Sequence, residues 1–365
     1  MKNVYITGGH LTPALAVIDE LIKKKENLSI IFIGREYAQG KSMHSREREE
    51  MEVRSVPFIS IDAPKFHRAL WWENISEIPK ILPTLQKLFT MFRKNKPDLV
   101  VSFGGYVALP VALIAKLFGA KVLTHEQTRV AGLANQAIAL FADHVAVSYP
   151  ESARFFPKAK VKFTGNPIRE SLFREYTRPP TWLPDSFTKK PFVYVTGGSQ
   201  GSHIINQTLR AILPKLAKEY LVVHQCGKGE LELHVSADLE QGSYVAREWI
   251  EAKEVSFLLR HAKFVISRAG ANTVQELSIA GTPAIYIPLA FAYNDEQYKN
   301  CAEVVRAGAS LLLLQKNLLP STLWSAIQTM ERRYPTLKRN MSEFQKHLVL
   351  DGTRRFTKLI TDSLQ

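Results

Sequence analysis

The stretch NVYITGGH, at residues 3–10, joins a run of β-branched and aromatic residues to a pair of glycines. Such a run is typical of a short strand, and Gly8-Gly9 lets the backbone turn tightly and approach a ligand closely. A second stretch, FVYVTGGSQG at residues 192–201, repeats the order of strand and glycine pair. Each is followed by a helical pattern, so the chain is predicted to contain two Rossmann-like domains.

Further short apolar runs alternate with helical patterns along the whole chain. In the first half we expect strands at residues 3–6, 29–34, 56–61, 99–103, 121–124 and 144–148. In the second half we expect them at residues 192–195, 221–224, 243–246, 264–267, 284–288 and 311–314. The alternation predicts an α/β protein with parallel sheets, covered by helices and facing each other across a cleft.

A linker is expected near residues 177–184 (TRPPTWLP), where three prolines interrupt any periodicity. We assign residues 1–166 to the first domain and residues 167–341 to the second, with the linker region at about residues 167–190. The last helix, about residues 342–365, is expected to cross back to the first domain. A length of 365 residues suits two domains of this size.

The chain is strongly basic, with 48 Lys and Arg against 34 Asp and Glu and a net charge of +14. Such an excess favours a polyanionic partner, namely nucleic acid, an acidic membrane surface or phosphorylated substrates. Nucleic acid is not expected, because zinc-finger spacing and RNA-binding aromatic signatures are lacking. The two cysteines, Cys226 and Cys301, lack metal-ligand spacing, and no signal-peptide pattern occurs, so we expect a reducing cytosol.

Three glycine pairs follow predicted strands: Gly8-Gly9, Gly104-Gly105 and Gly197-Gly198. They should therefore lie at the carboxyl edges of the sheets, where α/β proteins bind ligands. Helix N–H groups at such turns can face phosphates, and three loops together favour a phosphate-containing ligand. A dinucleotide oxidoreductase is disfavoured, because no G-x-G-x-x-G with a downstream acidic residue is present.

Two motifs of the second half keep alternative interpretations open. Thr273 and Glu276 have the spacing of a capping box, with Thr273 as N-cap, but Glu276 could instead accept hydrogen bonds from ribose hydroxyls. Gln297 and Asn300 lie on one helical face, where their amides suit sugar hydroxyls or simply a solvated surface.

Ten segments occur in the order of a known family. They are residues 7–16 (TGGHLTPALA), 103–107 (FGGYV), 125–127 (HEQ), 132–135 (GLAN), 141–148 (FADHVAVS), 164–169 (TGNPIR), 197–201 (GGSQG), 224–227 (HQCG), 268–273 (RAGANT) and 295–300 (DEQYKN). Over about residues 4–312 this set resembles the MurG family of N-acetylglucosaminyltransferases. The first loop is shorter than the family's G-G-T-G-G-H, and Thr128 stands where an asparagine usually follows His-Glu-Gln.

The resemblance implies a GT-B fold and an inverting transfer of N-acetylglucosamine. The donor would be UDP-GlcNAc and the acceptor undecaprenyl-diphosphate-linked N-acetylmuramyl-pentapeptide, in peptidoglycan synthesis. The donor-binding residues implied are Arg169, Ser199, Gln200, Ile250, Arg268, Ala269, Glu276, Gln297 and Asn300. The acceptor-binding residues implied are Gly8, Gly9, Thr12, Gly104, Gly105, Tyr106, His125 and Asn135. In this context the ligand-binding interpretations of Glu276 and Gln297 are preferred.

An inverting transfer needs a base for the acceptor hydroxyl. His10 is our candidate, because its ordinary pKa lies near neutrality and it sits in a glycine loop. Glu126 is the rival candidate for the base.

No Asp-x-Asp motif ends a strand, so we expect neither a metal nor another cofactor. The negative charge on the leaving diphosphate is instead expected to be stabilised by Arg169, the Ser199 loop and helix N-termini.

A membrane-facing segment is expected at residues 64–72 (PKFHRALWW), where Trp71 and Trp72 are interleaved with basic residues. The apolar stripe that follows is interpreted as core packing, and it comprises Ile75, Ile78, Leu82, Leu85, Phe89 and Phe92. The protein is therefore expected to be peripheral, at the cytoplasmic face of a bacterial cell membrane.

Other functions stay open beside this one. A related GT-B transferase could act on another glycolipid or polyprenyl-linked sugar. A UDP-sugar 2-epimerase shares the architecture, but His125-Glu126-Gln127 and the RAGA segment at residues 268–271 argue against it. A non-catalytic nucleotide-sugar-binding subunit is the alternative that is not an enzyme.

Overall fold

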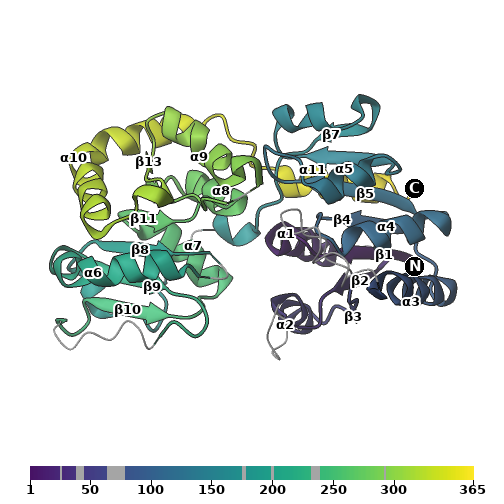
Figure 1. The fold of residues 1–365 in the computed structure, drawn as a ribbon, viewed down its shortest axis with the longest axis horizontal. Coiled ribbons are helices and arrows are strands. Elements are labelled where there is room, and N and C mark those ends of the chain that lie inside the picture. Colours follow the sequence, from purple (N-terminus) through teal and green to yellow (C-terminus); the bar gives the residue numbers. More distant parts are fainter. Residues whose placement is uncertain are drawn as a thin grey trace. The chain divides into compact units, whose positions relative to one another are not determined.

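The computed structural model describes residues 1–24, 27–37, 45–63, 79–174, 178–198, 201–231, 239–291 and 293–365. It divides into two compact units (Figure 1), one of Met1–Arg169 with Val349–Gln365 and one of Glu170–Leu348. The long helix α10 (Pro320–Gln345) belongs to the second unit, so the chain returns to the first at Val349 and not at residue 342.

The first unit contains a seven-stranded parallel sheet in the order β3-β2-β1-β4-β5-β6-β7. The strands are β1 (Lys2–Thr7), β2 (Leu28–Gly34), β3 (Phe58–Ser60), β4 (Leu99–Ser102), β5 (Lys121–Glu126), β6 (His144–Val147) and β7 (Val161–Phe163). The central strands are buried on both faces, as their near-continuous apolar runs require.

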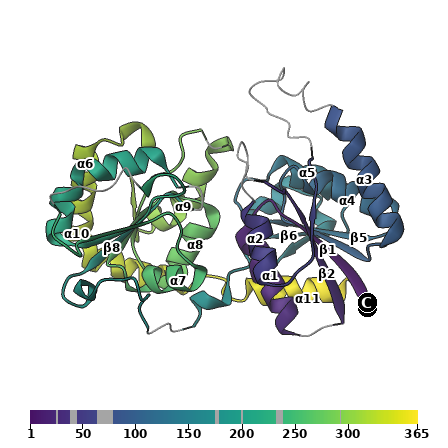
Figure 2. The same ribbon diagram turned by 90° about the horizontal axis from the view of Figure 1, so that it is seen from below.

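Helices cover both faces of this sheet (Figure 2). On one face lie α1 (Leu11–Lys23), α2 (Arg46–Val53) and the C-terminal α11 (Gly352–Asp362), and on the other α3 (Ile81–Lys94), α4 (Ala108–Leu117) and α5 (Leu133–Ala139). Side chains of β1 point alternately to the two faces of the sheet. Val4 and Ile6 pack with α1 on one face, and Tyr5 packs with α3 and α4 on the other.

The second unit repeats this plan with a six-stranded parallel sheet in the order β10-β9-β8-β11-β12-β13. Its strands are β8 (Phe192–Thr196), β9 (Leu221–Gln225), β10 (Tyr244–Arg247), β11 (Phe264–Ser267), β12 (Ala284–Tyr286) and β13 (Leu311–Leu312). Its remaining helices are α6 (His203–Glu219), α7 (Ala252–His261), α8 (Ala271–Ala280) and α9 (Glu296–Arg306). One apolar cluster joins α6 and α10 to the sheet.

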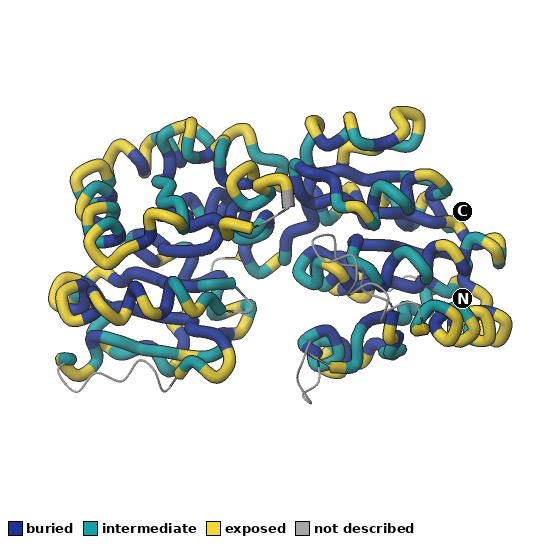
Figure 3. Tube along the Cα trace, in the orientation of Figure 1, coloured by how far each residue is buried: buried dark blue, intermediate teal, exposed yellow. Residues whose placement is uncertain are grey.

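The predicted α/β class with two Rossmann-like domains is confirmed, and every expected strand is present. Strand β7, a three-residue edge strand that is half-buried at best, is not among the strands predicted from the sequence. Figure 3 shows buried strands at the centre of each unit and exposed residues on the outer helices. In the described ranges, no helix is both long and apolar enough to cross a membrane.

Candidate functional site

Two glycine loops meet at the carboxyl edge of the first sheet. Gly8-Gly9 follows β1 and Gly104-Gly105 follows β4, and the strand order reverses between these two strands. Such a reversal is where open α/β sheets bind ligands. A Cβ added to Gly9, which has φ +147°, would lie 2.2 Å from the carbonyl oxygen of Gly104. Only glycine therefore lets the two loops touch through their backbones.

His10 is the N-cap of α1 and is half-buried beside these loops. Its Nδ1 lies 3.1 Å from the carbonyl oxygen of Phe103, the residue before the second glycine pair. A carbonyl only accepts hydrogen bonds, so Nδ1–H is the donor. In the neutral ring Nε2 is then unprotonated and can accept a proton, which is the arrangement a general base needs.

Glu126, the rival base, is buried at the end of β5 and is occupied by its own loop. Oε1 accepts from the N–H of Thr128 at 3.0 Å, and the Thr128 hydroxyl lies 2.8 Å from the same oxygen. Oε2 accepts from the N–H of Gly132 and from Nδ2 of Asn135, both at 2.9 Å. Glu126 thus stabilises the turn between β5 and α5, and the geometry favours His10 as the base.

His125, predicted to bind the acceptor, lies inside the first unit. Its Nε2–H donates to the carbonyl oxygen of Gly165 at 3.1 Å, and its ring lies 5.7 Å from that of Phe103 and 4.9 Å from that of Phe356. Burial lowers the pKa of His125 to about 4, so the ring is neutral at pH 7. The residue joins β5 to the C-terminal helix.

Asn135 is also buried, and its side chain braces the second glycine loop. It donates to the carbonyl oxygen of His125 at 3.1 Å and accepts from the hydroxyl of Thr124 at 2.7 Å. A Cβ on Gly104 would lie 3.3 Å from the Asn135 amide. Among the predicted acceptor residues, Thr12 and Tyr106 are half-buried in the first turn of α1 and just before α4.

The second sheet reverses its strand order between β8 and β11. Gly197-Gly198 follows β8, whereas Ser199 and Gln200 lie outside the described residues. The loop continues to Gly201, where an added Cβ would lie 2.3 Å from the carbonyl oxygen of Cys226. A glycine loop and a helix N-terminus therefore occupy the switch point of this unit as well.

Arg268 connects separate segments at the carboxyl edge of the second sheet. Its Nη1 donates to the carbonyl oxygen of Ile287 at 3.1 Å and its Nη2 to the hydroxyl of Ser202 at 2.8 Å. Ser202 is the N-cap of α6. Among the described residues no carboxylate pairs with this buried guanidinium, and burial lowers its pKa. A buried cation at a helix N-terminus suits an anion such as a diphosphate.

Glu276 is buried in α8 and does not form the capping box considered above. The helix begins at Ala271 with Gly270 as N-cap, so Thr273 lies inside the first turn. The capping interpretation is wrong, because the helix starts two residues before Thr273.

The neighbouring amides contact the same edge. Nδ2 of Asn300 donates to the carbonyl oxygen of Ala269 at 3.2 Å, which joins two predicted donor residues. Oε1 of Gln297 accepts from the N–H of Leu289 at 3.0 Å.

The structure also places two further predicted donor residues, Ile250 and Arg169. Ile250 lies in the segment that joins β10 to α7, and its side chain is buried. Arg169 was predicted to lie in the second domain, but it is the last residue of the Met1–Arg169 segment of the first unit.

Glu47, a carboxylate buried against the first glycine loop, is not among the residues predicted from the sequence. It lies in the charged run REREE at residues 46–50, which is typical of a solvated helix. Over the described parts of the chain, no group of three or more His, Cys, Asp or Glu residues could hold a metal ion.

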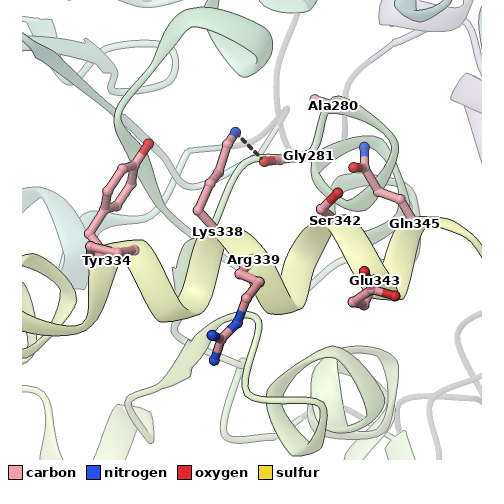
Figure 4. Close-up of a pocket in the computed structure, with 9 residues that line it drawn as sticks. Ala280, Gly281, Tyr334, Lys338, Arg339, Ser342, Glu343 and Gln345 are labelled. Carbon is pink, nitrogen blue, oxygen red and sulfur yellow. Dashed lines mark hydrogen bonds between the residues drawn. The ribbon is translucent and has the colours of Figure 1, made fainter.

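A groove of about 660 Å³ lies between α10 and the end of α8 and contains none of the predicted site residues. In Figure 4, Lys338 reaches across it to Gly281, whose carbonyl oxygen accepts from Nζ at 2.6 Å. Gln345 donates to the carbonyl oxygen of Ile279 at 2.9 Å. These side chains donate hydrogen bonds to the last carbonyl groups of α8, and these residues of the groove thus cap this end of the helix.

Two Rossmann-like units, each with a glycine loop at its switch point, define the GT-B class of α/β fold. A UDP-GlcNAc 2-epimerase of Neisseria meningitidis, 16% identical, aligns with a TM-score of 0.68 over 99% of this chain and 100% of its own. At that identity the similarity shows the fold alone.

The two units match the two domains of one enzyme family. Residues 7–147 match the glycosyltransferase family 28 N-terminal domain, and residues 192–356 match the family 28 C-terminal domain. The chain belongs to glycosyltransferase family 28, in its MurG branch, and is a glycosyltransferase.

The relatives of this branch cover the chain almost completely. One is the Bacillus cereus protein named UDP-N-acetylglucosamine--N-acetylmuramyl-(pentapeptide) pyrophosphoryl-undecaprenol N-acetylglucosamine transferase 2. It is 32% identical over 349 residues, 94% of this chain and 96% of its own length. The crystal structure of Acinetobacter baumannii MurG is 26% identical, with a TM-score of 0.72 over 99% of this chain and 100% of that one.

Proposed function

We propose that this enzyme transfers N-acetylglucosamine from UDP-GlcNAc to undecaprenyl-diphosphate-linked N-acetylmuramyl-pentapeptide, in peptidoglycan synthesis. The observation that carries the proposal is the similarity to the Bacillus cereus transferase over 94% of this chain, through both units. The glycine loops at both switch points support a substrate with phosphates on each unit. These phosphates and an anionic surface, rather than nucleic acid, account for the charge of +14.

In the proposed reaction Nε2 of His10 accepts the proton of the acceptor hydroxyl. The hydroxyl oxygen attacks the anomeric carbon of the donor sugar, and UDP departs with the electrons of the broken carbon–oxygen bond. Its negative charge is met by Arg268 and by the N-terminus of α6. Glu276, Gln297 and Asn300 are proposed to hold the donor's hydroxyls. We propose that no metal or other cofactor takes part.

The test offers purified enzyme UDP-GlcNAc with lipid-linked muramyl-pentapeptide and, separately, with diacylglycerol. Transfer to the first acceptor supports the proposal. Transfer to diacylglycerol alone would assign the enzyme to glycolipid synthesis, and turnover with neither, despite donor binding, would favour a binding subunit.

The role of His10 is tested by His10→Ala with Glu126→Gln as the comparison. His10→Ala should lower kcat by roughly 10²–10⁴-fold with little change in donor KM, because it removes the proton acceptor. Glu126→Gln should lower stability more than it lowers kcat, since four contacts of the β5–α5 turn depend on the carboxylate. The reverse pattern would make Glu126 the base.

We propose that the first unit contacts the cytoplasmic face of the cell membrane through α3 and α4. Leu82 and Phe89 of α3 are 64% and 50% exposed, and Leu117 of α4 is 73% exposed. Leu82 and Phe89 thus depart from the core packing expected for the stripe, whereas Phe92 is buried and Leu85 packs against the core as expected. Ile75 and Ile78, like Trp71 and Trp72, lie outside the described residues.

Basic side chains flank this apolar surface, with Arg93, Lys94 and Lys96 exposed at the end of α3. Apolar groups rimmed by cations are typical of surfaces that enter anionic headgroups.

Leu82→Ser with Phe89→Ser should reduce binding to anionic vesicles and transfer to the natural lipid acceptor, but not transfer to a short-chain soluble acceptor. Val53→Ser with Leu140→Ser is the matched control, because both side chains are exposed outside α3 and α4. Equal vesicle binding by the two double variants would refute the membrane surface.

A further inference from the structure

Glu47 is a buried carboxylate in a helix whose other charged residues are partly or fully exposed. It lies in the first turn of α2, whose N-cap Ser45 accepts a hydrogen bond from the N–H of Arg48. Its side chain is 8% exposed, whereas Glu52 of the same helix is exposed. Burying a carboxylate is costly, and buried carboxylates concentrate at functional sites.

The carboxylate occupies space that two glycines leave free. A Cβ on Gly8 would lie 2.5 Å from Oε1 of Glu47, and a Cβ on Gly34 would lie 2.5 Å from Oε2. These glycines follow or end β1 and β2, which are neighbours in the sheet. Oε2 accepts a hydrogen bond from the N–H of Arg35 at 2.9 Å. Glu47 therefore sits at the base of the first glycine loop.

Contacts lead from Glu47 to both parts of the predicted acceptor site. Through Gly8 the carboxylate lies next to Gly9, and Gly9 is in backbone contact with Gly104. Through Arg35 it reaches Tyr106, because the guanidinium carbon of Arg35 lies 5.8 Å from the centre of the Tyr106 ring. Burial raises the pKa of Glu47, while the Arg35 N–H and the Arg35 charge oppose that rise.

We propose that Glu47 is a positioning residue, whose carboxylate fixes the loop carrying His10 and the backbone of Arg35 in the arrangement that transfer requires. The inference rests on the proposed function. This role differs from a purely structural one, because the groups that Glu47 contacts lie at the predicted acceptor site. None of them belongs to the second unit, which is predicted to bind the donor.

Four variants test this role. Glu47→Ala should lower kcat about ten- to hundred-fold and leave the donor KM unchanged, since misplacing a catalytic group acts on the chemical step. Glu47→Gln keeps the shape and an acceptor for the Arg35 N–H, so it should recover most of the activity. Gly8→Ala should resemble Glu47→Ala, because its methyl group displaces the carboxylate. Glu52→Ala, on the exposed side of α2, is the control and should match the wild type.

Rates are measured below the melting temperature of every variant, together with the hydrogen exchange of residues 8–12 and 104–106. Faster exchange in these segments of Glu47→Ala, with unchanged exchange in the second unit, supports the positioning role. Unchanged exchange, or unchanged kcat with a lowered melting temperature, would overturn it. Absence of wild-type transfer refutes the proposed function, whereas the exchange measurement still decides the role of Glu47.

Discussion

His125 makes the stability of the first unit depend on pH. Its pKa is about 4 in the folded protein, below the usual 6.5, because burial disfavours the charged ring. Well above pH 6.5 the ring is neutral in both states, so the residue has little pH effect there. As the pH falls through 6.5, His125 of the unfolded chain binds a proton, whereas His125 of the folded chain stays neutral. The free energy of unfolding therefore decreases progressively down to about pH 4.

The magnitude follows from these two pKa values. The full shift of 2.5 units corresponds to about 3 kcal/mol, and about 2 kcal/mol of this is lost between pH 7.5 and pH 5. Among the described residues, the contacts of the His125 ring are with the Phe103 and Phe356 rings and the Gly165 carbonyl oxygen, none of which is an anion that would offset the loss.

The assay is urea unfolding at these two pH values, with hydrogen exchange of β5 peptides to report on the first unit alone. His125→Gln is the comparison, because glutamine can still donate to Gly165 but binds no proton. The wild type should lose about 2 kcal/mol more than the variant on acidification. Equal losses would show that the buried ring is not the source of the pH dependence.

Three further predictions concern the core, the donor and the metal. Phe356→Ala should destabilise the first unit by about 3–5 kcal/mol, because a fully buried ring is lost; unchanged urea unfolding of that unit would contradict its place in the core. Glu276→Ala should raise the donor KM roughly ten-fold or more through loss of a charged hydrogen-bond acceptor worth about 1.5–3 kcal/mol. A fall in melting temperature with an unaltered KM would instead assign it a structural role. Transfer should survive EDTA, because Arg268 and helix N-termini meet the charge of the diphosphate; loss of turnover restored by magnesium or manganese would refute this.

The fold was predictable because its signal is local and repeated. Each central strand is a short apolar run that ends in a loop, and the strand-helix alternation leaves few arrangements. The edge strand β7 was missed, since Val161 and Phe163 flank a lysine in a run too short to stand out. The interpretation of α3 as core packing was wrong for Leu82 and Phe89, which are exposed, although Phe92 of the same helix is buried.

The site was predictable only in part, because a polar side chain can either form hydrogen bonds within the protein or bind a ligand. Glycine pairs after strands located both sheet edges correctly. The family resemblance implied that His125 and Asn135 bind the acceptor, whereas the structure buries both in hydrogen bonds with their own unit. Glu47 escaped notice because its burial depends on Gly8 and Gly34, which are distant in the sequence.

The position of α11 has a consequence for how the chain is made. Residues 170–348 form one continuous unit, but the first unit includes Phe356 and Ile360 in its core. On the ribosome the N-terminal sheet therefore emerges first and is completed last, the reverse of the usual order of domain folding. Throughout synthesis of the second unit, the apolar surface that α11 will cover has no partner from its own chain. A premature stop codon just before α11 would thus give a complete second unit joined to an incomplete first unit. Chaperones and proteases would then act on this product as on a misfolded protein.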